Sequence, residues 1–317
     1  MAGVKQNLAV DLDGVRFPLP VLAASGCFGT GRELGGLTDI RKLGGVITRS
    51  LTFEASRGWP TPRVTESPSG VVTAVGNQNP GVREFVAEDL PGLAKTGIPV
   101  VASVTGTTLQ EYIRVASILR DEPGISAVEV HLSGPDRESR GLPFYARIDR
   151  MGEVVGAISR LSPVPVFAKL PALLPDVVPA ARACVRAGAH GVTLIDAIPA
   201  MVVDVRRLRP RLGAVIGGLS GPAIRPIAVA AVFRVAQALP QVPIMGVGGI
   251  ASAEDAVEFL LAGAWAVQVG TAMLVNPSAP AEIAEGIAGF LKSKGLTSPG
   301  DLRGRLRLSE PEGMGGE

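Results

Sequence analysis

The stretch that most constrains the fold runs from residue 242 to residue 272, with the sequence VPIMGVGGIASAEDAVEFLLAGAWAVQVGTA. Its pattern predicts a buried strand, a glycine turn, a helix, a second strand and a second glycine turn. Gly248 and Gly249 end the first strand, and Gly270 and Thr271 end the second. Glycine lets the backbone approach an anion, and helix N-termini offer unpaired N–H groups. Either turn alone is compatible with a plain tight turn, but two of them at adjacent strand ends predict the phosphate site of a (β/α)8 barrel.

The rest of the chain repeats this alternation of strand and helix. Short runs rich in valine and isoleucine are typical of parallel strands that are covered on both faces. The number of such runs is enough to close a (β/α)8 TIM barrel. We expect the strands at residues 21–24, 45–49, 100–104, 127–132, 166–170, 192–196, 244–247 and 266–269.

Two connections are much longer than the others, at residues 50–99 and 197–243. Long insertions after barrel strands usually build the rim of the active site and not a separate domain. The predicted fold class is therefore α/β, with one (β/α)8 domain over residues 1–308 and long loop insertions at its C-terminal rim. We expect residues 309–317 to form a disordered C-terminal tail.

Charge and cysteine content exclude several classes of protein. The formal net charge is only +2, and no basic stripe contains interleaved aromatic residues, so we expect no nucleic-acid partner. Cys27 and Cys184 lack the spacing of metal ligands, so we expect no metal site. The N-terminus has no apolar segment of signal-peptide length, and glycines and Gln268 interrupt the apolar residues 259–275. We therefore expect a cytoplasmic protein without a membrane span.

Several motifs carry a more specific indication. They are AASGCFGTG at residues 23–31, GWPTPRV at 58–64, NQNPG at 77–81, AKL at 168–170 and GGLSGPAIRP at 217–226. In this order they resemble the dihydroorotate dehydrogenase family, above all class 1 and, within it, the 1B catalytic subunit. The resemblance covers nearly the whole chain. It implies a TIM-barrel oxidoreductase that binds FMN and acts on CH–CH groups, as in pyrimidine biosynthesis.

The resemblance also assigns residues to the FMN site. Ala24 and Ser25 match backbone positions beside the isoalloxazine ring, and Lys169 matches the lysine near flavin N1. A fixed cation there would stabilise the anionic reduced flavin, whereas a lysine that snorkels to solvent is the alternative. The other cofactor positions are Arg49 and Ser103, where the family has lysine and asparagine, and the phosphate seat of Gly221, Gly248, Gly249, Gly270 and Thr271.

The substrate side departs from the family at the catalytic base. In the family, the loop after the fourth strand carries a cysteine (class 1) or a serine (class 2) that removes a proton from dihydroorotate. In this chain the loop has the sequence HLSGPD over residues 131–136, and Gly134 occupies the position of the base. Glycine has no group that takes a proton, so the family mechanism cannot run unchanged.

The positions expected to bind orotate differ as well. Thr73, His131, Asp136 and Asp196 stand where the family has asparagine, while Asn77 lies in the NQNPG motif. An ionised aspartate only accepts hydrogen bonds, whereas asparagine both donates and accepts them. Added carboxylates also repel an anion. These substrate-binding positions therefore predict a small-molecule substrate other than orotate, with hydrogen-bond donors or positive charge.

His131 is the preferred acid or base among the candidate catalytic residues. Histidine in general titrates near neutrality, and the end of this strand should face the flavin. Asp136 or Asp196 would orient the imidazole, and Ser133 and Lys169 complete the catalytic candidates. A buried histidine that only packs and bonds to a backbone carbonyl is the alternative.

Three functions remain open at this point. The first is an FMN-dependent oxidoreductase with a rebuilt pocket, which the polar nature of the replacements favours. The second is a genuine dihydroorotate dehydrogenase with a relocated base, for which Glu138, Ser139 and Tyr145 lie in the same loop. The third is a non-catalytic FMN-binding or regulatory relative.

The resemblance extends to partners. The 1B type works with an iron–sulfur flavoprotein subunit that passes electrons to NAD, and the resemblance permits such a partner here. No cysteine cluster in this chain could hold an iron–sulfur centre, so the cluster would belong to the other subunit. By analogy with the family, we expect a homodimer.

Overall fold

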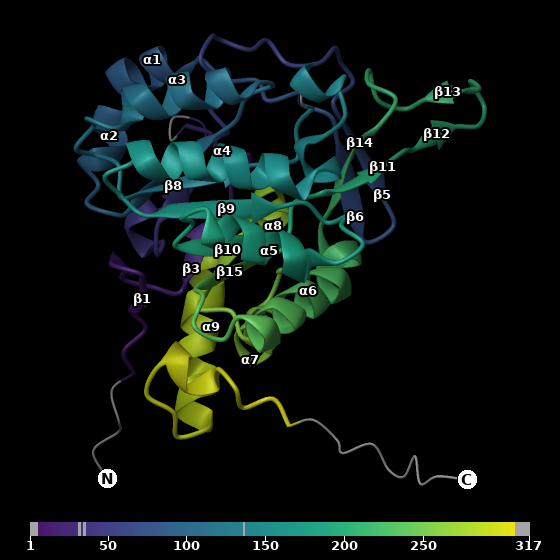
Figure 1. Ribbon diagram of the computed structural model, residues 1–317. Helices are drawn as coiled ribbons and strands as arrows, with labels where there is room; N and C mark the ends of the chain where they lie inside the picture. The colour runs from purple at the N-terminus through teal and green to yellow at the C-terminus, as the bar shows by residue number, and fades with distance from the viewer. Residues whose placement is uncertain (1–5, 31–32, 34–35, 136, 308–317) are drawn as a thin grey trace, which may run out of the picture.

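Eight parallel strands close into one barrel, which confirms the predicted (β/α)8 fold (Figure 1). The computed structural model describes residues 6–30, 33, 36–135 and 137–307, so Asp136 and the predicted tail lie outside the described residues. Each barrel strand pairs with the next one along the chain, and the last pairs with the first. The barrel strands are β3 (Val21–Ala23), β4 (Val46–Ile47), β7 (Val100–Val104), β8 (Ala127–His131), β9 (Val166–Leu170), β10 (Gly191–Leu194), β15 (Ile244–Val247) and β16 (Ala266–Val269).

Helices cover the outside of the barrel, and each buries one face. In α4 (Ile148–Leu161), Met151, Val154, Val155 and Ile158 are buried at helical spacing. None of the described helices is long and apolar enough to cross a membrane. The remaining helices are α1 (Val82–Glu84), α2 (Leu90–Ala94), α3 (Leu109–Leu119), α5 (Val177–Arg186), α6 (Arg225–Ala238), α7 (Ala253–Ala262), α8 (Thr271–Val275) and α9 (Ala279–Ser293).

A hairpin closes the N-terminal end of the barrel. It consists of β1 (Val10–Leu12) and β2 (Val15–Phe17), which pair in antiparallel register. Leu12 and Phe17 are fully buried and pack in one cluster with barrel residues that include Leu22, Ile47 and Phe167. The lower part of the barrel is therefore filled with apolar side chains, which leaves its C-terminal end for polar groups.

The two long insertions pair with each other. They form a four-stranded antiparallel sheet in the order β11–β14–β6–β5, beside the barrel (Figure 1). Thr73 on β6 lies opposite Gly218 on β14. The first insertion supplies β5 (Val64–Ser67) and β6 (Gly70–Thr73), and the second supplies β11 (Ile198–Ala200), β14 (Gly217–Ser220) and the short hairpin of β12 (Val203–Asp204) and β13 (Arg209–Pro210).

We predict that Phe17→Ala destabilises the protein by about 3–5 kcal/mol, because it leaves a cavity at the closed end of the barrel. The free energy of unfolding in denaturant measures the loss. Val205→Ala is the control, since Val205 is 77% exposed and a surface truncation should change stability by no more than about 0.5 kcal/mol. Equal effects of the two changes would contradict the assigned role of the hairpin.

Candidate functional site

A histidine and an aspartate meet at the C-terminal end of the barrel. His131 is the last residue of β8, and Asp196 follows β10 by two residues. The Nε2 atom of His131 lies 2.8 Å from Oδ2 of Asp196. Because a carboxylate only accepts hydrogen bonds, a neutral His131 carries its proton on Nε2, which leaves Nδ1 as the basic nitrogen. The structure thus brings together two predicted residues in the arrangement of an oriented base.

A chain of three serine hydroxyls begins at the free side of this imidazole. Nδ1 of His131 lies 3.5 Å from Oγ of Ser50, which lies 2.9 Å from Oγ of Ser103 and 3.5 Å from Oγ of Ser25. These serines come from the ends of three neighbouring barrel strands. The predicted cofactor residues Ser25 and Ser103 therefore join His131 through Ser50. The sequence analysis missed Ser50, although it directly follows Arg49 at the expected end of a strand.

Asp196 is held in its ionised form. Burial opposes its charge, but the neighbouring His131 and the Lys169 ammonium outweigh burial and lower the pKa of Asp196 well below its usual range. The Ser133 hydroxyl also lowers this pKa, yet among the described residues its buried Oγ has no hydrogen-bond partner of normal geometry. We therefore treat Ser133 as a neighbour of the His131–Asp196 pair and not as part of it.

Lys169 is a buried cation next to this pair. It lies in register between His131 on β8 and Thr193 on β10, and only 5% of its surface is exposed. The side chain therefore does not snorkel to solvent. Burial by itself lowers the pKa of Lys169, but the carboxylates of Glu129 and Asp196 reverse this and raise the pKa above its ordinary value. The ammonium charge is thus retained inside the barrel.

The glycine turns converge at the ends of β14, β15 and β16. Gly221, Gly248 and Gly249 have φ values of +96°, +129° and +76°. A Cβ atom on Gly249 would lie 2.8 Å from the carbonyl oxygen of Gly221, so these two turns are in close contact. The Thr271 hydroxyl donates to Oγ of Ser220 at 2.8 Å, which joins the third turn to them. Only glycine allows this approach of backbones.

The converging turns offer free backbone donors. Among the described residues, the N–H groups of Gly249, Ile250, Thr271 and Ala272 donate no hydrogen bond within the protein. Arg225 lies beside Gly249 but already pairs with Asp255 and Glu258. An anion in this place would therefore be held by backbone amides and not by a free cation.

The N-terminus of the helix after the first turn is closed by a capping box. Ser252 caps α7, and its hydroxyl accepts from the N–H of Asp255. The Asp255 carboxylate in turn accepts from the N–H groups of Ala251 and Ser252, each at 2.9 Å. The cap therefore occupies the backbone donors of Ala251, Ser252 and Asp255. The N–H groups of Ala253 and Glu254 donate no hydrogen bond among the described residues, so this helix end keeps two donors beside those of the turns.

The other predicted site residues are more scattered. Ala24 lies beside Gly270, because a Cβ atom on Gly270 would be 3.5 Å from its Cβ. The Arg49 guanidinium donates to the carbonyl oxygen of Gln78 at 3.0 Å, so it contacts the first insertion. Thr73 lies in the small antiparallel sheet and Asn77 in the loop after it. Within the described part of the chain, no hydrogen bond links Thr73 or Asn77 to His131 or Asp196.

Gly134 leaves space where the family has its base. A Cβ atom there would meet only the Gly106 carbonyl oxygen at 3.7 Å and Oγ1 of Thr105 at 3.9 Å, which are ordinary contacts. Cys27, whose Sγ lies beside Gly270, is no replacement, because burial raises the pKa of its thiol to about 11 against the opposing effects of Lys169 and Arg49. A protonated thiol is a poor base and nucleophile at neutral pH.

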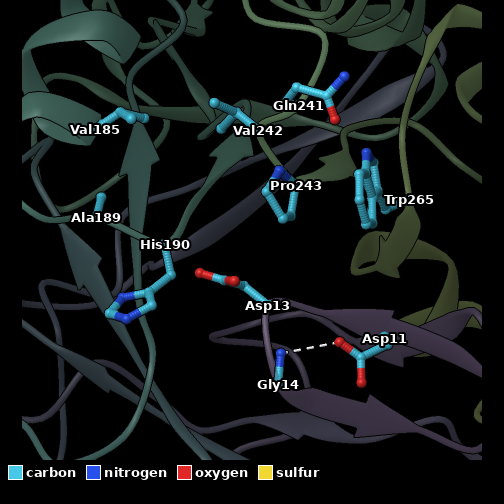
Figure 2. A pocket seen from close by; sticks show the side chains of 10 residues that line it. All are labelled: Asp11, Asp13, Gly14, Val185, Ala189, His190, Gln241, Val242, Pro243 and Trp265. Atoms are coloured by element: carbon cyan, nitrogen blue, oxygen red, sulfur yellow. Dashed lines mark hydrogen bonds between the residues drawn. The ribbon is translucent and has the colours of Figure 1, made fainter.

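A cavity of about 460 Å³ lies at the opposite end of the barrel (Figure 2). Asp11 on β1 and Asp13 in the β1–β2 turn line it, together with Trp265 and His190. Nδ1 of His190 accepts a hydrogen bond from the N–H of Val166 at 3.1 Å, which gives this histidine a structural role. Among the described residues, no group of three or more histidine, cysteine or acidic side chains could hold a metal ion.

Comparison with known proteins identifies the family. The family model described as dihydroorotate dehydrogenase matches residues 7–291. The chain belongs to the dihydroorotate dehydrogenase family. Members of this family are FMN-dependent oxidoreductases that act on a CH–CH group, which confirms the resemblance and the class of enzyme.

The most similar relatives include proteins of two types. A "Dihydroorotate dehydrogenase B (NAD(+)), catalytic subunit" of Geotalea daltonii is 42% identical over 96% of this chain and 99% of its own length. The protein of the same name in Desulforudis audaxviator is 44% identical over 95% of this chain and 98% of its own. A "Putative dihydroorotate dehydrogenase A (fumarate)" of Solibacter usitatus is 42% identical over 95% and 99%.

The lowered pKa of Asp196 predicts a specific pH dependence of stability. Ionised Asp196 stabilises the fold above the ordinary aspartate pKa of about 3.9, and this contribution is lost as the pH falls below that value toward the lowered pKa. The melting temperature of the wild type should exceed that of Asp196→Asn at neutral pH. The difference should shrink between about pH 5 and pH 3.

Asp13→Asn is the matched control for this experiment, because Asp13 is exposed on a turn far from His131. Its melting temperature should follow that of the wild type throughout the titration. A difference between wild type and Asp196→Asn that stays constant with pH would show that Asp196 acts through packing and not through its charge.

Proposed function

We propose that the chain binds FMN and catalyses hydride transfer between the flavin and a small molecule other than orotate. The observation that carries this proposal is the His131–Asp196 pair, which lies beside Lys169 at the barrel end where Gly134 has replaced the base of the family. Catalytic groups of TIM-barrel enzymes come from this end of the strands.

The chain's residues fit FMN at two points. The free N–H groups of Gly249, Ile250, Thr271 and Ala272 suit the phosphate, because they converge from turns that only glycine permits. The buried Lys169 ammonium suits the isoalloxazine ring, since a fixed cation favours negative charge on the reduced ring. When bound, FMN supplies the hydride chemistry. Orientation and proton transfer are left to the protein.

His131 moves the proton in this proposal. Asp196 holds the Nε2–H and stabilises the imidazolium that forms when Nδ1 takes a proton. Nδ1 faces Ser50, whose hydroxyl lies within hydrogen-bond distance of Ser25 and Ser103 and is positioned by them. The proton that accompanies hydride transfer is thus given or taken at Nδ1 of His131, either directly or through the Ser50 hydroxyl.

The charges around His131 disfavour a carboxylated substrate. Asp196 is ionised, and the charge of Lys169 is shared between Glu129 and Asp196. Asparagine at position 196 would donate a hydrogen bond to an orotate oxygen, whereas the aspartate only accepts. We propose that the substrate carries N–H donors or positive charge toward Asp196.

A genuine dihydroorotate dehydrogenase is the second candidate function. The names and near-complete coverage of relatives at 42–44% identity favour it. In this case His131 would replace the missing base for dihydroorotate itself. The relatives named as catalytic subunits also support an iron–sulfur flavoprotein partner for this chain under either function. A homodimer and a cytoplasmic location remain expectations.

We predict that Gly249→Ala lowers the FMN content of the purified protein at least tenfold. A Cβ atom there would lie 2.8 Å from the Gly221 oxygen and from Cβ of Arg225, at a φ of +76°, so the turn must open and its donors diverge. Gly263→Ala is the control, with a φ of +119° and a contact of 2.3 Å to Ala236 at the end of α7. It should lower stability but retain FMN. Equal flavin contents in the two variants would contradict the phosphate seat.

The substrate class is tested by anaerobic bleaching of the flavin absorbance. Dihydroorotate and 5,6-dihydrouracil are matched probes, because they share a ring and differ by one carboxylate. We expect the wild type to be yellow. Dihydroorotate should leave its flavin oxidised, whereas dihydrouracil should reduce it. His131→Gln should abolish this reduction and keep the FMN. Rapid bleaching by dihydroorotate in the wild type would establish the second candidate instead.

In the same assay, Gly134→Cys distinguishes the effect of the pocket charges from the effect of the missing base. The added side chain fits without a clash, since its Cβ has no neighbour closer than 3.7 Å. We expect dihydroorotate to remain inactive with this variant because the pocket still repels its carboxylate. If Gly134→Cys gains rapid reduction by dihydroorotate, only the base has been lost and the argument from the pocket charges is wrong.

A further inference from the structure

A carboxylate is buried inside the barrel, one layer below His131. Glu129 precedes His131 by two residues on β8, so both side chains point to the same side of the strand. Glu129 is fully buried. The Thr193 hydroxyl and the Gln268 amide both donate to its Oε2 at 2.9 Å. Its Oε1 has no hydrogen bond among the described residues but lies 3.7 Å from Nζ of Lys169.

This environment identifies the counter-ion of Glu129. Two neutral donors do not compensate an ionised carboxylate that has left water, so a cation must lie nearby. Lys169 is the cation that the structure pairs with Glu129. Thr193 on β10 and Gln268 on β16, two strands that only β15 separates, hold the carboxylate and fix where the Lys169 ammonium is attracted.

The other charged groups around Lys169 are less available to it. Asp196 acts on Lys169 from the end of β10, but its carboxylate is engaged by His131 at 2.8 Å. Cys27 faces Lys169 from the loop after β3, and its thiol is protonated at neutral pH. Arg49 acts on Cys27 from the end of β4 and adds like charge. Glu129 is therefore the carboxylate that forms the ion pair with Lys169, whereas Asp196 is bonded to His131 and adds a second negative charge nearby.

We propose that Glu129 is a positioning residue, the buried counter-ion that keeps Lys169 protonated and holds its ammonium group at the site. The consequence for the flavin rests on the FMN-binding function proposed above. With Glu129 present, Lys169 stays charged across the neutral and alkaline range, so it stabilises reduced flavin to the same extent throughout that range.

A double-mutant cycle of thermal unfolding tests the pair directly. The variants are Glu129→Gln, Lys169→Met and the double variant, all measured on the full chain. Glu129→Gln leaves the buried ammonium with only the Asp196 carboxylate, which is already bonded to His131, so the double variant should melt at a higher temperature than Glu129→Gln alone. If the Glu129→Gln protein fails to fold while the double variant folds, the result also supports the ion pair. Additive changes in melting temperature would overturn the proposal.

The reduction potential of bound FMN gives a readout that a merely structural role would not move. Lys169→Met should lower the ratio of reduced to oxidised flavin at fixed potential about tenfold, or about 30 mV for a two-electron couple. The potential of Glu129→Gln should fall toward that of Lys169→Met as the pH rises from about 6 to 9, because the lysine without its ion-pair partner loses its proton. Thr193→Val removes a hydrogen bond from Glu129 but no charge, and it should follow the wild type.

The outcomes separate this inference from the proposed function. A wild type that binds no FMN would overturn the proposed function, and the unfolding cycle would then decide the ion pair by itself. A Glu129→Gln protein whose potential follows the wild type at every pH, while Lys169→Met is shifted, would overturn the role of Glu129.

Discussion

Closure of the barrel is the constraint on which the rest of the structure depends. Eight short strands close only if alternate side chains fill the interior, and the β1–β2 hairpin seals one end with Leu12 and Phe17. Apolar filling there leaves the opposite end for Lys169, His131 and their partners. Buried charges are stable in that place only as compensated sets, so Glu129 and Asp196 are required by the same geometry that brings the strands together.

The barrel was largely predictable because its signal is local. Strands such as β9 and β16 are mostly apolar, and the structure begins and ends them where the sequence predicts. The strand expected at residues 45–49 is shorter, since only Val46–Ile47 forms the ladder. The pairing of β6 with β14 could not be foreseen, because no local pattern indicates that two distant insertions will share a sheet.

The site was predictable as a set of residues but not as an arrangement. His131, Asp196, Ser103 and Lys169 were identified individually, yet only the barrel shows that Asp196 takes Nε2 of His131 and leaves Nδ1 to Ser50. Glu129 and Gln268 were missed although both interrupt apolar strands, which is a signal that alternation along the strand could have used.

The pairing of β6 with β14 also fixes the separation between the glycine turn at Gly221 and the loop that carries Asn77. Gly221 follows directly on β14, beside Gly70 at the start of β6, while β6 ends at Thr73 and leads to the loop with Asn77. The glycine turn and that loop are therefore attached to opposite ends of one short ladder, about 10 Å apart at the usual rise of a strand. Any set of bound molecules that touches both ends must fill that span. Insertion of two residues into either strand would change the size of what fits without altering a single side chain that contacts it.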